Sequence, residues 1–256
     1  TARTAAIATI NPALTAGTIG GTQAICSGAT PTTLTSSTAA SGGTGSLTYQ
    51  WQISTTSAVA GFTDILSANA ATYSPGVLSQ TTYYRRGVST SIDAVVYSSA
   101  VTVTVNPLPT VLTTTDGART GTGTVSLSGT ASAGATLDWY AASSGGSVLS
   151  GGTGVLTFIT PSISTTTSYY AEARNSTSGC ISTSRTLVTA TINGSLTAGS
   201  ISGAQTICAG STPTTITSST AASGGTGSRT YQWQVSTDNT NFTDIPSANA
   251  ATYSPG

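Results

Sequence analysis

The chain has 256 residues, of which only 5% are charged, and its seven basic side chains balance its seven acidic ones. A neutral chain lacks the basic patch that binds nucleic acid or anionic lipid, and no apolar run reaches the roughly 18 residues of a membrane-spanning helix. Because there is no histidine or lysine to act as a base near neutral pH, we expect no enzymatic activity, no catalytic residue and no cofactor.

The first segment, residues 1–12, is expected to be the last strand of a preceding domain that is missing from the sequence. When the chain is shifted by 182 residues, Arg3 matches Arg185 and Asn11 matches Asn193. Because the matching stretch closes the second unit of the chain, the sequence predicts that the chain begins inside such a strand.

The next unit, residues 13–106, shows the alternation of apolar and polar residues that is typical of half-buried strands. In Tyr49–Ile53 the aromatic residues and the isoleucine share one face and the glutamines share the other. Trp51 lies in the middle of this run, so we expect it to anchor the core. Tyr83, from the Tyr83-Tyr84 pair, is our second candidate core residue, although the two arginines that follow leave open which tyrosine points inward.

The third segment, residues 107–193, repeats this design with a different sequence. Trp139 lies mid-strand in the run LDWYA, and Tyr169 is followed at alternate positions by two alanines. The sequence therefore predicts Trp139 and Tyr169 as core residues, the latter much like a tyrosine corner. The preceding linker, NPLP, is proline-rich and should be stiff and extended, which favours end-to-end stacking of the units.

The last segment, residues 194–256, is a close repeat of the first unit. Pro31–Gln52 and Pro213–Gln234 are identical at 20 of 22 positions, and the string SANAATYSPG occurs in both copies. Trp233 is thus the expected core anchor of a truncated domain. Units of about 90 residues, short strands and frequent glycine turns predict an all-β fold of tandem immunoglobulin-like β-sandwiches in an elongated array.

The three cysteines are expected to be unpaired. Cys26 and Cys208 occupy equivalent positions in the two copies, and Cys180 lies near the end of the unit between them. A bridge between Cys180 and Cys208 needs Cα atoms within about 7 Å, whereas about 13 residues of strand on each side of the joint would separate them by roughly 80 Å. We favour buried or terminal free thiols, with contact to another chain as the alternative.

No candidate metal site emerges from the sequence. There is no calcium-binding loop, and three cysteines without histidine do not complete a zinc site. Asp64 and Asp244 recur in the string FTDI, where a turn or a pairing with arginine explains them better than a cation does.

Several strings together resemble a known family. GSISGAQTIC, PTTLTSSTAASGGTGS, TYQWQ and TTYYRR, with GTGTVSLSGTASAGATLDWY in the other unit, are similar to the immunoglobulin-like repeats of giant surface proteins of Bacteroidota, of the SprB gliding-motility adhesin type. The resemblance implies type IX secretion and display outside the cell. It also implies an intradomain disulfide at Cys180 in many relatives, but the partner position here is Thr120.

The sequence thus indicates a structural stalk segment of a cell-surface adhesin filament that supports adhesion and gliding. Its expected partners are neighbouring repeats of the same chain, with surface polysaccharide or the secretion and motility machinery as further candidates. Two alternatives stay open. One is a glycan-binding module that uses exposed aromatic residues such as Tyr140, and the other is a self-assembling extracellular fibre or sheath, since few charges guard the strand edges.

Overall fold

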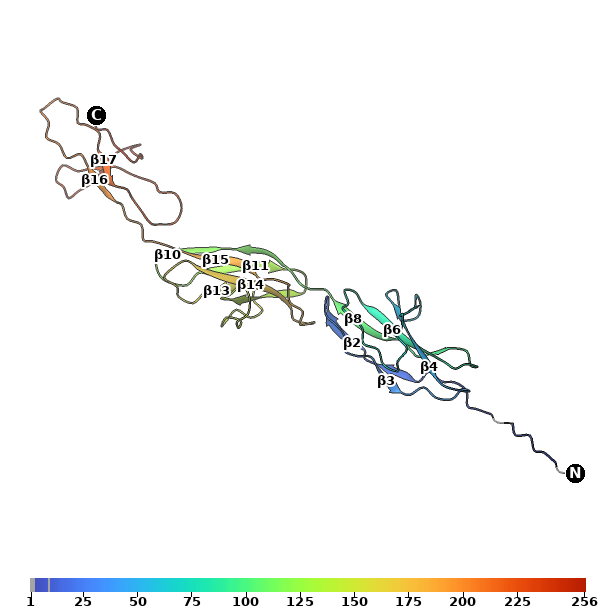
Figure 1. Ribbon diagram of the computed structural model, residues 1–256. Helices are drawn as coiled ribbons and strands as arrows, with labels where there is room; N and C mark the ends of the chain where they lie inside the picture. The colour runs from blue at the N-terminus through green and yellow to red at the C-terminus, as the bar shows by residue number, and fades with distance from the viewer. Residues whose placement is uncertain (1–2, 9) are drawn as a thin grey trace. The chain divides into compact units, whose positions relative to one another are not determined.

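A computed structural model describes residues 3–8 and 10–256, and within this part of the chain every regular element is a β-strand. The chain divides into two compact units (Figure 1). The first comprises residues up to Thr110 together with Ala133–Ala135 and Arg174–Thr183, and the second comprises the remainder. The expectation of an all-β fold is confirmed.

Residues 3–8 and 10–14 form no strand. The strand expected over residues 1–12 stays a prediction, because residues 1, 2 and 9 lie outside the described residues and the neighbouring strands would belong to another domain.

The first sandwich is built on a sheet with the order β2-β8-β6-β4-β5, in which β7 also pairs with β6, while β1 pairs with β3. The first strand of this sheet, β2, runs parallel to the last strand, β8, and the other pairs are antiparallel. The strands are β1 (Thr18–Gly20), β2 (Gln23–Cys26), β3 (Thr35–Thr38), β4 (Thr48–Ser54), β5 (Thr63–Asp64), β6 (Thr82–Ser89), β7 (Val96–Tyr97) and β8 (Val101–Asn106).

The second sandwich has two sheets, with orders β10-β15-β14-β12 and β13-β11-β9. Here too an early strand, β10, runs parallel to the closing strand, β15, so both sandwiches share one topology. The strands are β9 (Val111–Thr115), β10 (Gly117–Thr120), β11 (Ser126–Ala131), β12 (Ala135–Tyr140), β13 (Thr157–Ile159), β14 (Thr167–Asn175) and β15 (Thr186–Asn193).

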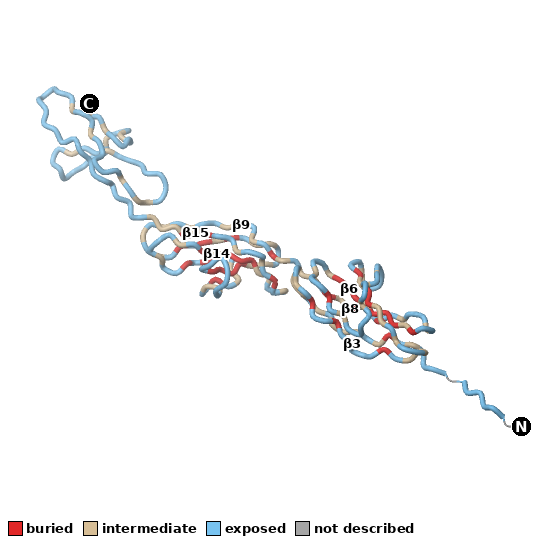
Figure 2. Tube along the Cα trace, in the orientation of Figure 1, coloured by how far each residue is buried: buried red, intermediate tan, exposed pale blue. Residues whose placement is uncertain are grey.

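The repeat copy that follows has only short strands, which are β16 (Ser200–Ser202), β17 (Thr217–Thr220), β18 (Gln234–Val235) and β19 (Thr243–Asp244). They form two separate pairs, β16 with β17 and β18 with β19. Figure 2 shows the consequence: buried residues fill both sandwiches, whereas the repeat copy near the C-terminus has exposed and partly buried residues.

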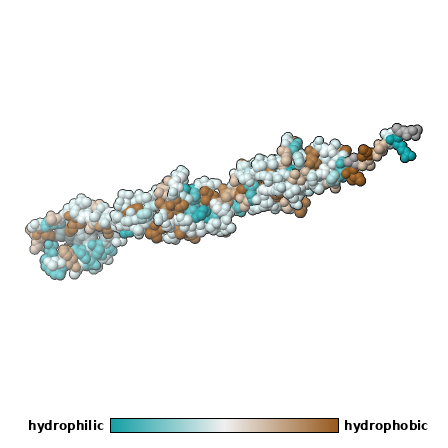
Figure 3. Space-filling view, turned by 90° about the horizontal axis from the view of Figure 1, so that it is seen from below, coloured by the Kyte–Doolittle hydropathy of each residue, from teal (hydrophilic) through white to brown (hydrophobic). Residues whose placement is uncertain are grey.

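Alternation along the strands explains where the cores form. On β12 and β14 the apolar residues that point inward join residues of β11, β13 and β15 in one cluster around Trp139. The outward positions are mostly serine and threonine, so the surface seen in Figure 3 is largely near neutral in hydropathy, with apolar side chains scattered over it. Hydroxyl groups therefore provide the solvation that charges usually give.

Candidate functional site: aromatic cores and a disulfide joint

Each complete sandwich is centred on three aromatic rings from different strands and loops. In the first, Trp51 lies 5.8 Å from Tyr73, which lies 5.7 Å from Tyr84, measured between ring centroids. Trp51 is 0% exposed, and its indole N–H donates to the carbonyl of Ala70 at 2.9 Å. A buried indole whose N–H is satisfied contributes packing without a polar penalty.

The second sandwich uses the same arrangement with different residues. Trp139 stacks on Phe158 at 5.6 Å, and Phe158 meets Tyr169 edge-on at 5.7 Å. Trp139 is 0% and Tyr169 5% exposed, and burial raises the pKa of Tyr169 above its ordinary value. Together these rings bridge the two sheets of the sandwich.

Tyr83 was the wrong choice for the core of the first sandwich. Tyr84 is the buried tyrosine, at 1% exposure, and Tyr83 is only partly buried. The reason is Arg86, which shares the inward face with Tyr84 and is itself 0% exposed. Its guanidinium donates to the carbonyls of Ala16 at 2.9 Å and Ala71 at 2.8 Å, so an inward arginine is accommodated by backbone acceptors.

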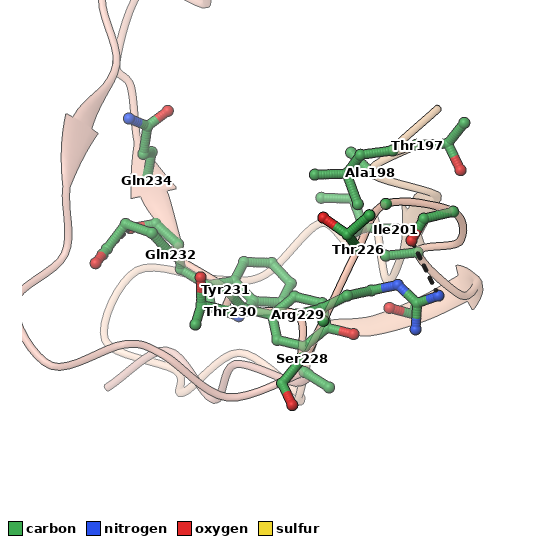
Figure 4. A pocket seen from close by; sticks show the side chains of 18 of the residues that line it. Thr197, Ala198, Ile201, Thr226, Ser228, Arg229, Thr230, Tyr231, Gln232 and Gln234 are labelled. Carbon is green, nitrogen blue, oxygen red and sulfur yellow. Dashed lines mark hydrogen bonds between the residues drawn. The ribbon is translucent and has the colours of Figure 1, made fainter. Parts of the chain in front are cut away.

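Trp233 was also wrongly expected to be a buried anchor, because it is only partly buried. It stacks on Tyr253 at 5.6 Å and donates to Ala250 at 2.8 Å, as its counterpart Trp51 does to Ala70. An open cavity of about 860 Å³ lies beside it, lined by residues that include Leu196, Ile201 and Tyr231 (Figure 4). In the first copy, strands β6 and β8 pack against the equivalent tryptophan.

The expectation of three unpaired cysteines is wrong for two of them. Cys26 and Cys180 form a disulfide, with Cα atoms 5.6 Å apart. Cys208 is free and exposed. The bonded cysteines are 154 positions apart in the sequence and meet across the joint that precedes Cys180, whereas Cys180 and Cys208 flank the joint that follows it.

Strand topology brings Cys26 and Cys180 together, and both belong to the first compact unit. Cys26 ends β2, which runs parallel to β8 and places Cys26 opposite Asn106, the last residue of that strand. The next N–H, of Ser27, donates to the Asn106 carbonyl at 2.9 Å. Cys180 lies in the turn that connects β14 to its antiparallel neighbour β15. The first cysteine loop (residues 21–32) thereby meets the cysteine turn (residues 174–181).

The cysteine turn is held by its own hydrogen bonds. Asn175 donates its N–H to the Cys180 carbonyl at 2.9 Å, and its side-chain oxygen accepts from the N–H groups of Thr177 and Ser178, each at 3.0 Å. Cys180 is 1% exposed. The signal that could have predicted this bond is a cysteine at the end of an early strand that pairs in parallel with the closing strand, as β2 does with β8, together with a cysteine between the last two strands of the next domain.

Tyr140, proposed above as an exposed glycan-binding residue, is instead buried at 8% exposure. Its hydroxyl donates to Glu172 at 2.9 Å, and the Arg185 guanidinium lies 3.3 Å above its ring. Arg185 also pairs with Glu172 at 3.2 Å and donates to the carbonyl of Gly145 at 2.6 Å. Burial, followed by this hydrogen bond, raises the pKa of Tyr140. The cluster secures a turn, and with Arg185 on one face and 8% exposure the ring offers no exposed platform for a sugar.

The residues that the structure describes contain no group of three or more histidine, cysteine, aspartate or glutamate side chains that could hold a metal ion. Asp64 and Asp244 each accept a hydrogen bond from a glutamine side chain at 2.8 Å, from Gln52 and Gln234 respectively. Across the described range, no helix is long and apolar enough to cross a membrane.

The strand orders and the tryptophan-centred cores define a tandem array of immunoglobulin-like β-sandwiches. Two family models match the chain. Residues 15–107 and 197–256 match a domain of unknown function, DUF8696, and residues 108–193 match an Ig-like domain, CHU_C associated. The chain therefore belongs to the DUF8696 family, with an Ig-like domain between its two copies.

Several solved structures are similar to the chain at low sequence identity. The fibronectin(III)-like modules of Clostridium thermocellum CbhA are 13% identical, with a TM-score of 0.33, and the match covers 72% of this chain and 95% of that one. Extracellular domains 3–5 of Drosophila OTK are 14% identical, with a TM-score of 0.31 and coverage of 89% and 82%. The N-terminal four Ig domains of Dscam1 isoform 8.4 are 13% identical, with a TM-score of 0.30 and coverage of 67% and 43%. No curated protein matches the chain. Ig-like domains of this kind are typical of extracellular structural and adhesion modules.

Proposed function

We propose that this chain is a load-bearing stalk segment of a bacterial cell-surface adhesin filament, which projects an adhesive end and supports adhesion and gliding motility. The observation that carries the proposal is the disulfide between Cys26 and Cys180. It links a residue in the range of the first family match to a residue in the range of the second. Disulfides persist outside the reducing cytosol, which supports an extracellular, secreted location.

The bond has a direct mechanical consequence. Tension applied at the two ends passes from residue 26 through the sulfur atoms to residue 180, so the covalent path leaves out the residues between them. Both tryptophan anchors, Trp51 and Trp139, and the strands from β3 to β14 lie within that bypassed stretch. A pulled filament therefore cannot extend the strands from β3 to β14, whereas β15, which adds Val188 and Ala190 to the second core, stays in the path of the tension.

Single-molecule force extension of the full chain, tethered at its two ends, tests the proposal. With the disulfide intact, the chain between the two cysteines, which are 154 positions apart in the sequence, contributes no length. After reduction it adds roughly 500 Å of contour length, at about 3.3–3.6 Å per residue. Cys208→Ser, which leaves the bond in place, is the matched control and should behave as the parent chain does. Equal final lengths before and after reduction would overturn the load-bearing role.

A further inference from the structure

The loop that carries the free Cys208 has the same internal geometry as the first cysteine loop. In the first copy, the Gln23 side-chain oxygen accepts from the N–H and hydroxyl of Thr32 at 2.9 and 3.1 Å. In the second copy, Gln205 accepts from Thr214 at 2.7 and 3.1 Å. The second cysteine loop (residues 203–214) is therefore already formed in the absence of a bonded partner.

The position of Cys208 gives its thiol a defined chemical role. Its repeat equivalent, 182 residues earlier in the sequence, is Cys26, whose sulfur is bonded to Cys180. Cys26 is partly buried against its partner turn, whereas Cys208 is exposed. Cys26, the equivalent of Cys208, is therefore bonded to a partner. That partner is a cysteine in the turn after the penultimate strand of an Ig-like domain.

A second observation points to the same kind of partner. In the repeat copy the apolar residues around Trp233 are uncovered: Ile201 is 64%, Val235 51% and Phe242 52% exposed. Their counterparts in the first copy, Ile19, Ile53 and Phe62, are all partly buried. In that copy the core around Trp51 is completed by Tyr84, Val101 and Val103 from strands β6 and β8.

We propose that residues 197–256 are the receiving half of a covalent joint for a segment with the sequence character of residues 77–193. The strands of that segment equivalent to β6 and β8 cover the open face beside Trp233. The cysteine turn of its Ig-like domain then forms a disulfide with Cys208. The inference rests on the tandem organisation of the proposed function and extends it to a repeating covalent joint.

Formation of this bond is a two-electron oxidation. The Sγ atoms of Cys208 and of the incoming cysteine each lose a hydrogen and become joined. A disulfide oxidant, such as oxidised glutathione, takes up the two electrons and two protons and leaves as two thiols. Because the second cysteine loop is preformed, little conformational entropy opposes the reaction once the strands are in place.

The test extends the full chain after Gly256 by a second copy of residues 77–193, since both copies share the ten residues that precede this point. Ile181→Val in the appended copy makes its cysteine turn lighter by one methylene group and so identifiable by mass. The protein is folded in a glutathione redox buffer, its free thiols are alkylated, and its tryptic peptides are identified by mass spectrometry. Oxidative footprinting of the peptide that begins at Thr230 reports on Trp233.

The expected result is a disulfide between the Cys208 peptide and the cysteine-turn peptide of the appended copy, which is identified by its lower mass. The oxidation rate of Trp233 should fall to that of Trp51 in the same sample. Cys208→Ser should lose the link and keep Trp233 protected. Alkylated Cys208 beside a protected Trp233 would overturn the covalent joint, and an unprotected Trp233 would overturn the proposed occupant of the face. In either case a retained Cys26–Cys180 link leaves the load-bearing role of the first joint intact.

Discussion

The two copies of the repeated unit have the same local hydrogen bonds and very different burial. In the first copy the Trp51 indole N–H donates to the Ala70 carbonyl at 2.9 Å, and in the second Trp233 donates to Ala250 at 2.8 Å. The glutamine that precedes each tryptophan also reaches an equivalent isoleucine carbonyl, at 2.7 Å in the first copy and 2.9 Å in the second. Yet Trp51 is fully buried and Trp233 is not.

This difference shows that the local hydrogen bonds depend on the repeated residues alone, whereas burial of the tryptophan depends on pairing with later strands. Turns and loop hydrogen bonds form in both copies because both partners of each bond lie within the repeated residues, as for Thr33 with Ser74 and Thr215 with Ser254. Burial depends on strands β6 and β8, which begin some 30 and 50 residues after Trp51. The cooperative stability of the unit therefore comes from those later strands, since they supply most of the apolar area that is removed from water.

The largest effect is expected when each tryptophan is replaced by alanine. Trp51→Ala should lower the free energy of unfolding of the first sandwich by about 3–5 kcal/mol, because it empties a filled core. Trp233→Ala should change the stability of the chain by less than about 1 kcal/mol, as substitutions outside a core do. Urea unfolding followed by far-ultraviolet circular dichroism measures both. Similar losses at the two positions would show that the open copy has a packed core in solution.

The next largest effect on the free energy of unfolding is expected at the equivalent positions Cys26 and Cys208. Cys26→Ser removes a cross-link that closes a long loop, so unfolding should become easier by roughly 2–5 kcal/mol. Cys208→Ser removes an exposed, unbonded thiol and should leave the unfolding midpoint unchanged. Thermal unfolding with and without a reducing agent measures both variants. If reduction fails to bring the parent chain to the midpoint of Cys26→Ser, the bond is not the source of the difference.

The division between local features and long-range pairing also explains which predictions from the sequence were correct. Period-2 alternation and one tryptophan per unit suffice to predict an all-β immunoglobulin-like array, because strand faces and core anchors are local properties. The choice between Tyr83 and Tyr84 could not be made locally. It depends on whether Arg86 can turn inward, and that is decided by the carbonyl groups of Ala16 and Ala71, which lie in two other loops, the first of them 70 residues away.

The disulfide was missed for a related reason. Cys26 and Cys180 meet only because β2 pairs in parallel with β8 and β14 folds back along β15. The residues beside the cysteines do not predict either of these strand pairings. Tyr140 was placed on an exposed face by alternation alone, whereas the ion pair between Arg185 and Glu172 covers it.

The smallest expected effect concerns Tyr84, the member of the aromatic trio of the first copy that the second copy lacks. Burial, and then the neighbouring Tyr73, raises the pKa of Tyr84 to about 12, whereas an unfolded tyrosine titrates near 10. Between about pH 10 and 12 the unfolded chain has therefore released a proton that the folded chain retains. Stability falls with rising pH where the unfolded state binds fewer protons, so the urea midpoint of the first sandwich should decline across this window.

Tyr84→Phe should flatten that decline and leave the midpoint at pH 7 nearly unchanged, because it keeps the ring and removes only the ionisable hydroxyl. Tyr83→Phe, at the neighbouring and only partly buried tyrosine, is the matched control for the substitution itself and should leave the midpoint at pH 7 unchanged. Comparing each variant with the parent at the same pH cancels base-catalysed loss of the disulfide, which all three proteins share. If Tyr84→Phe and the parent decline in parallel from pH 10 to 12, the alkaline sensitivity arises elsewhere. The buried trio would then stabilise the sandwich without making its stability depend on pH.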